Sequence, residues 1–134
     1  MFRILTGGCL LFAAAVLAAC GGSPAQPAAS RELAAAKVVV LLDRATKAGD
    51  WKLICSDLYS KEVRQQAGGS DCPNLLSRVA GGVRSPSIDI EAMTIGAGTA
   101  TVKVTTRAEG QEPVPETIRL ERDDTGRFRI AGLE

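Results

Sequence analysis

The hydrophobic pattern of the chain changes its period once, near Gly82, and this change limits the fold more than any other feature. Before Gly82, apolar residues recur at the spacing of amphipathic helices. After Gly82, apolar and polar residues alternate, which is typical of strands that bury one face. Helices followed by an antiparallel meander predict an α+β domain, in which N-terminal helices pack on a curved antiparallel sheet of about four strands.

The longest predicted helix begins after Ser30, which is a suitable N-cap, and ends at Gly49, which suits the position after the C-cap. We expect Asp43 and Lys47 to lie on the side away from the core. The expected core stripe consists of apolar residues at helical spacing, namely Ala34, Val38, Leu41, Leu42, Ala45 and Ala48.

Shorter helices follow this one. Asp50 and Ser60 are each placed to cap a helix, and Pro73 suits the first position of the last one, which we expect to end near Val79. Residues 67–71 are rich in glycine and predict a loop.

Four segments predict strands, joined by a glycine-rich hairpin at residues 95–99, a loop at 109–116 and a tight turn at 122–126. The prolines of the 109–116 segment should keep it out of a central strand. The apolar residues expected to face the core are Ile88 and Ile90, then Ala100, Val102 and Val104, then Ile118 and Leu120, and finally Phe128 and Ile130.

Composition narrows the function classes. The chain has 134 residues, 16 Lys and Arg against 15 Asp and Glu, and no histidine. The length suits one small domain. A neutral chain without a basic stripe exerts little attraction on a phosphate backbone, so we expect no nucleic-acid partner.

The first twenty residues have the parts of a secretory signal: Arg3 near the start, an apolar run from Leu10 to Ala19, and small residues before Cys20. The stretch "LAAC", ending at Cys20, resembles the bacterial lipobox. The resemblance implies that residues 1–19 are removed and that Cys20 becomes a lipidated N-terminus. The protein would then be anchored to the cell membrane on its extracytoplasmic face.

Residues 20–30 contain the lipidated cysteine and a segment of Gly, Ser, Pro, Ala and Gln, which predicts a flexible tether. Residues 21–30 would span at most ~35 Å when fully extended. We therefore expect the folded domain, residues 31–134, to stay near the lipid headgroups.

The order of these features suggests a family. A helix ending in "AGDW", the strand "GAGTATVKV" and the terminal "DDTGRFRIAGL" resemble the small envelope lipoproteins with an NTF2-like domain. The resemblance covers most of residues 34–133. It implies a cone-shaped fold, with helices closing one side of the sheet, but no particular activity, because this superfamily is functionally mixed.

The residue types present argue against metal binding and against nucleophilic catalysis. Structural zinc needs four ligands, usually Cys and His, and the expected domain offers only Cys55 and Cys72. Without histidine, a cysteine or serine nucleophile lacks its usual base. The pair Asp123 and Asp124 is explained by a hairpin turn. We expect no metal and no cofactor.

Cys55 and Cys72 remain as a pair, one in a predicted helix and one at the start of the next. The compartment implied by Cys20 is one in which disulfides persist. Because metal binding and thiol catalysis are both disfavoured, we predict a Cys55–Cys72 disulfide.

We expect a non-catalytic module that binds a small apolar ligand or a partner protein of the cell envelope. Trp51 and Tyr59 are candidates to line an open cone, although we favour the alternative that they fill the core. A second hypothesis is a small isomerase, dehydratase or hydrolase with Asp89, Glu91 or Glu121 as a carboxylate base. A third is an interaction protein with a filled cone, which a groove or apolar patch would support.

Overall fold

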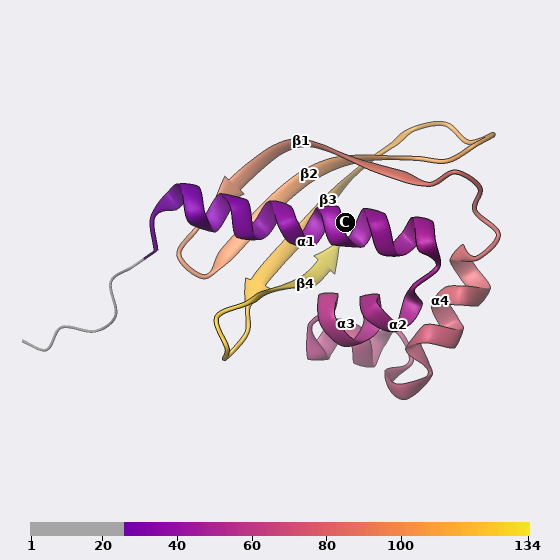
Figure 1. Cartoon of the computed structure of the whole chain (residues 1–134), viewed down its shortest axis with the longest axis horizontal. Helices are drawn as coiled ribbons and strands as arrows, with labels where there is room; N and C mark the ends of the chain where they lie inside the picture. Colours follow the sequence, from indigo (N-terminus) through magenta and orange to yellow (C-terminus); the bar gives the residue numbers. More distant parts are fainter. Residues whose placement is uncertain (1–25) are drawn as a thin grey trace, which may run out of the picture.

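A computed structural model describes residues 26–134, so the expected signal peptide and the lipidation of Cys20 lie outside the described residues. Helices cover one face of a four-stranded antiparallel sheet in the order β1-β2-β3-β4 (Figure 1). The predicted α+β class is confirmed. The elements are α1 (Ala28–Ala48), α2 (Trp51–Leu53), a π-helical turn η1 (Ile54–Leu58), α3 (Lys61–Gln66), a 3₁₀ turn η2 (Gly69–Asp71), α4 (Cys72–Ala80), β1 (Ser87–Ile95), β2 (Thr99–Arg107), β3 (Val114–Arg122) and β4 (Phe128–Leu133).

Helix α1 begins earlier than predicted. It starts at Ala28, and the carbonyl of Pro27 accepts the N–H of Ser30, so Ser30 lies inside the helix and is not its N-cap. Pro27 has a φ of −54°, close to a helical value, and the alanines after it favour helix. Residues 28–30, which we expected to belong to the tether, are therefore helical.

The end of α1 is as predicted. Gly49 has a φ of +66°, a conformation that glycine adopts without steric cost. Its N–H donates to the carbonyl of Thr46 at 3.2 Å, and the N–H of Asp50 donates to the carbonyl of Ala45 at 2.8 Å. These two bonds form a Schellman motif, which satisfies carbonyls at the end of the helix.

The core face of α1 is turned by about one residue from the predicted stripe. Leu41 is 41% exposed and Ala48 is exposed, which corrects both assignments, and Ala34 is only partly buried. The buried residues are Ala35, Val38, Val39, Leu42 and Ala45. Their spacing is that of a single helical face, so the error is in the phase and not in the period.

Asp43 does not lie on the free side of α1, as we had predicted. Its Oδ1 accepts the N–H of Ile88 at 2.9 Å, and its Oδ2 accepts Nζ of Lys47 at 2.7 Å. The carboxylate therefore ties α1 to the first residues of the edge strand β1.

The shorter helices start where their caps predict. Oδ1 of Asp50 accepts the N–H of Leu53 at 3.0 Å, and Oγ of Ser60 accepts the N–H of Val63 at 3.1 Å. Pro73 lies in the first turn of α4. In Figure 1, α1 runs along the sheet and the shorter helices lie below its C-terminal half.

Two details of the sheet differ from the sequence prediction. The pairing of β1 with β2 shifts between Ile90 and Ala92, which makes Glu91 a bulge. Ile90 pairs with the buried Val104 and so points to the core face, as predicted, but at the edge of the sheet it stays 39% exposed. Beyond the bulge, Met93 pairs with Val102 and packs against the core. Pro115 lies within β3, where its neighbour on one side is Thr105 of β2. Strand β4 pairs with β3 only from Ile118 onward, so Pro115 interrupts no ladder on that side.

The space between α1 and the sheet is filled by apolar side chains. Among residues 26–134, no polar or charged residue is buried. The strand residues of this core are Ala100, Val102, Val104, Ile118, Leu120, Phe128 and Ile130, all of which we predicted to face inward.

Candidate functional site

The Cys55–Cys72 pair forms a disulfide, as predicted. The two Cα atoms are 6.1 Å apart, and the side chains are 3% and 0% exposed. The bond joins η1 to the start of α4, and both cysteines are buried. These sulfur atoms therefore serve the fold and offer no accessible thiol.

The three acidic residues named as catalytic bases all lie on the surface. Asp89 pairs with Arg107 at 3.1 Å, Glu121 pairs with Arg119 at 2.9 Å, and Glu91 is exposed at the bulge. A carboxylate needs burial or a like-charged neighbour to become a good base near neutral pH. The carboxylate-base hypothesis thus loses the three candidates on which it depended.

The part of the chain that the structure describes contains no candidate metal site. No group of three or more Cys, Asp or Glu side chains there is placed to hold an ion. The two neighbouring acids Asp123 and Asp124 occupy the β3–β4 turn, as predicted.

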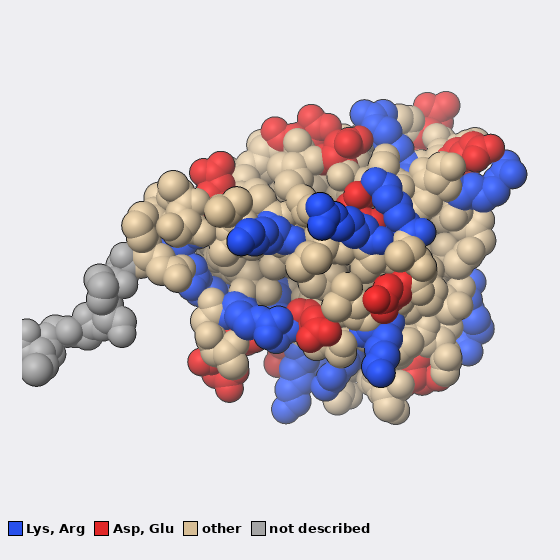
Figure 2. Space-filling view, viewed as in Figure 1, with Lys and Arg blue, Asp and Glu red and all other residues tan. Residues whose placement is uncertain are grey.

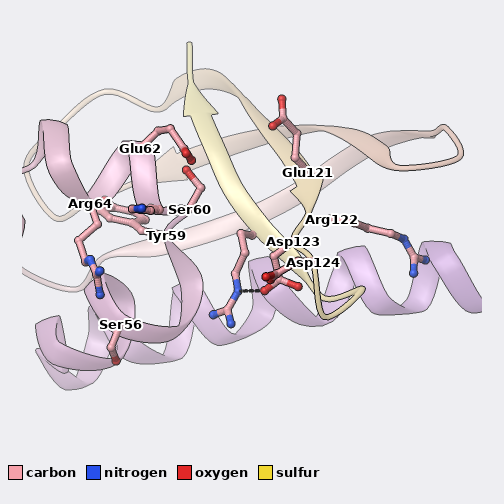
Figure 3. Close-up of a pocket in the computed structure, with 11 residues that line it drawn as sticks. Ser56, Tyr59, Ser60, Glu62, Arg64, Glu121, Arg122, Asp123 and Asp124 are labelled. Atoms are coloured by element: carbon pink, nitrogen blue, oxygen red, sulfur yellow. Dashed lines mark hydrogen bonds and ion pairs between the residues drawn. The ribbon is translucent and has the colours of Figure 1, made fainter.

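Asp123 organises that turn. Its Oδ1 accepts the N–H and Oγ1 of Thr125, and its Oδ2 accepts Nε of Arg129 at 2.8 Å (Figure 3). The hydrogen bonds from the side chains of Thr125 and Arg129 hold the pKa of Asp123 well below its usual range. The carboxylate is therefore ionised and fully engaged within the turn.

Tyr59 lines a shallow pocket of about 490 Å³ beside this turn, together with Ser56, Arg64 and Glu121. Figure 3 shows acidic and basic side chains around it, while Arg122 extends away from Tyr59. Burial raises the pKa of Tyr59. Because charges of both signs line it, the pocket selects neither an anion nor an apolar molecule.

Trp51 lies in a different depression, of about 620 Å³, with Lys47 and Pro86 among its neighbours. Both aromatic side chains are partly buried and pack against the core. The structure therefore does not bring Trp51 and Tyr59 together in one cone mouth, and each serves mainly as core packing.

A groove lined mainly by apolar residues lies between the N-terminal half of α1 and the edge strand β1, with a volume of about 460 Å³. Its walls are Ala29, Leu33, Ala36, Ile90, Ala92 and Met93, and two acidic residues, Glu32 and Glu91, complete the lining. Leu33 is 59% exposed. We call this feature the α1–β1 groove.

Sequence reasoning missed the α1–β1 groove for two reasons. Leu33 was outside the predicted core stripe and was left without a role. A leucine off that stripe, one turn from Ala29, could have indicated a second apolar surface. Ile90 was assigned to the core from its alternation with polar residues, and it does point to the core face opposite Val104, but the alternation does not show that its strand is an edge strand on which it stays 39% exposed.

Within residues 26–134, no helix has the length and hydrophobicity that crossing a bilayer requires. Comparison of the chain with protein-family models, curated proteins and solved structures finds no match of any of the three kinds.

Proposed function

We propose that the protein is a lipid-anchored, extracytoplasmic, non-catalytic module that binds a partner protein at the cell envelope. The anchor would be Cys20, after removal of residues 1–19, and the folded part would be an NTF2-like domain. The lipobox-like stretch before Cys20 supports the anchor. The buried Cys55–Cys72 disulfide supports an oxidising compartment, and the packing of helices on a four-stranded sheet supports the fold assignment.

One observation favours a protein partner over the small apolar ligand. The space between the helices and the sheet is filled by core residues such as Val39, Val102 and Ile130, each at most 1% exposed. An apolar ligand needs an enclosed site that buries most of its surface. Exposed apolar side chains remain outside the core, and Leu33 and Ile90 of these line the α1–β1 groove.

The chemistry of the α1–β1 groove indicates which segment would fit. Leu33, Ala36 and Met93 offer an apolar floor, and Glu32 and Glu91 place negative charge beside it. The edge strand β1 forms one wall, and such strands bind extended segments through their backbone. The expected partner segment is therefore extended and apolar, with a basic side chain near the acidic residues.

A photo-crosslinking amino acid at Ile90 tests this proposal in cells that produce the protein. We expect one defined crosslinked product from position 90, and its loss when Ala36 is changed to Arg, because the longer side chain would fill the groove. The matched control is the same crosslinker at Thr101, which is exposed on β2. Equal products from positions 90 and 101, or a product that survives Ala36→Arg, would contradict the assignment.

The anchor is tested separately by mass spectrometry of the N-terminal peptide. We expect a peptide that begins at Cys20 and carries a diacylglycerol. An unmodified peptide that begins elsewhere would remove the membrane from the proposal and leave the groove as a binding site.

A further inference from the structure

We propose that the outer face of α1 lies flat on the anionic headgroups of the membrane that holds Cys20. The outer face of α1 consists of Lys37, Val40, Leu41 and Arg44, with Leu33 at its border with the α1–β1 groove. The inference rests on the proposed lipid anchor, and it adds an orientation that the anchor alone does not give.

The outer face of α1 exposes more apolar surface than the fold needs. Leu33 is 59% exposed, Val40 is 42% exposed and Leu41 is 41% exposed. Leu33 and Val40 are separated by two helical turns and so lie on the same side. Scattered exposed apolar residues are ordinary, but a run of them along one helix indicates a contact surface.

Positive charge lies among these apolar residues. Lys37 and Arg44 are exposed, and neither takes part in an ion pair among the described residues. Helix α1 has four basic residues (Arg31, Lys37, Arg44 and Lys47) against two acidic ones (Glu32 and Asp43), a net charge of +2. Figure 2 shows basic side chains in a row over α1, with uncharged surface and a small acidic patch among them.

This combination is the one that interfacial helices use. Apolar side chains enter the boundary between headgroups and acyl chains, while Lys and Arg on the same surface bind anionic headgroups. The acidic residues are displaced from this line: Asp43 is bound to Ile88 and Lys47, and Glu32 lines the α1–β1 groove.

The position of α1 in the chain places this face close to the membrane. Only residues 21–27 separate Cys20 from Ala28, the first residue of α1. Fully extended, they reach ~25 Å, while α1 itself is about 32 Å long. The tether therefore keeps the helix at a high effective concentration near the headgroups, and a weak attraction is enough to hold it there.

A second copy of the chain fits this face less well than a bilayer does. Two such faces brought together would place Lys37 and Arg44 of one copy near the same residues of the other, and like charges across an interface repel. An anionic lipid surface complements them.

The test uses the mature, lipidated protein in vesicles of phosphatidylcholine, with or without phosphatidylglycerol. An environment-sensitive dye is attached to a cysteine introduced as Val40→Cys, or as Thr101→Cys in the control. We expect a blue shift and quenching by spin-labelled lipids for the dye at 40 in anionic vesicles, and neither for the dye at 101.

Removing the charges of Lys37 and Arg44 gives a second, quantitative test. Each basic residue near an anionic surface is worth about a fivefold change in the ratio of docked to undocked protein. The pair Lys37→Gln and Arg44→Gln should therefore lower that ratio roughly 30-fold, while the protein stays on the vesicles through its lipid. The matched control, Lys61→Gln with Arg64→Gln on α3, should leave the dye signal unchanged.

Three results would overturn the inference. The first is protein that floats with the vesicles while the dye at position 40 remains in water, which defeats the docking and leaves the anchor intact. The second is protein that does not float with the vesicles, which defeats the anchor and the docking together. The third is a dye at position 40 that becomes shielded in detergent as protein concentration rises, which would assign the face to a second copy.

Discussion

Removal of the Cys55–Cys72 disulfide should destabilise the domain by about 3 kcal/mol. The two residues are 17 positions apart, and the chain-entropy relation gives about 3 kcal/mol for a loop of this length. A small domain has a total stability of roughly 5–15 kcal/mol, so the loss is a large share. We expect the melting temperature of the double variant Cys55→Ala, Cys72→Ala to fall by roughly 12 °C.

The loss should be uneven across the structure. Helix α4 packs against α2 and η1, and Cys72 is its one buried residue. Val102 and Leu120 belong to the hydrophobic core cluster under α1, and the two cysteines do not. Without the bond, α4 should detach from the helical layer before the sheet unfolds.

Hydrogen exchange followed by mass spectrometry measures this difference on a chain that begins at Gln26. Amides of α4 should lose most of their protection in the double variant, and amides of β2 and β3 should lose only the part due to lower global stability. The control is reductant, which should lower the melting temperature of the parent protein and leave the double variant unchanged.

The reasoning fails if the double variant melts within about 2 °C of the parent, because the entropy argument predicts several times that shift. It also fails if α4 and the sheet lose protection equally, because the disulfide would then support the whole core and not one helix.

Three further changes have definite expected results, each measured by urea denaturation. Asp123→Asn removes a carboxylate whose pKa is lowered in the folded state. The difference in unfolding free energy between parent and variant should therefore be full above the unfolded pKa of about 3.9 and should shrink as the pH falls below it. A free-energy difference that is equal at pH 7 and pH 3 would contradict this. Asp43→Ala should lower the unfolding free energy by about 1–2 kcal/mol, because it leaves the N–H of Ile88 without its acceptor. Lys47→Ala removes only the exposed ion pair and should lower it by under about 0.5 kcal/mol. Equal losses would refute the role assigned to Asp43. Leu120→Ala should cost about 2–5 kcal/mol, because Leu120 is 0% exposed, and a loss under about 1 kcal/mol would show that the core is not closely packed there.

Features set by short-range chemistry could be predicted from the sequence. Gly49, Asp50 and Ser60 each cap a helix because a glycine, a carboxylate or a hydroxyl acts on backbone groups within a few residues. The alternation of Ala100, Val102 and Val104 was sufficient for β2 because the strand has no bulge between those residues.

Features set by tertiary contacts could not be predicted. Whether Ala92 or Met93 faces inward depends on the bulge at Glu91, which forms against β2 and not within β1 alone. The position of Tyr59 beside the β3–β4 turn depends on the contact of Ser60 with Ile130, 70 residues later, whose carbonyl accepts the Ser60 N–H at 2.8 Å. No local pattern carries such information.

The phase of α1 explains both the error in the predicted core and the two proposed surfaces. The stretch "LAAAKVVVLL", residues 33–42, is apolar around most of the helix, so more than one stripe can be drawn through it. The sheet covers one side, which holds Val38, Val39 and Leu42, and leaves Leu33, Val40 and Leu41 outside. A surface helix needs only the first set for stability. The second set gains nothing from the fold of this domain, and an apolar groove and a headgroup-facing surface are two contacts that would bury it.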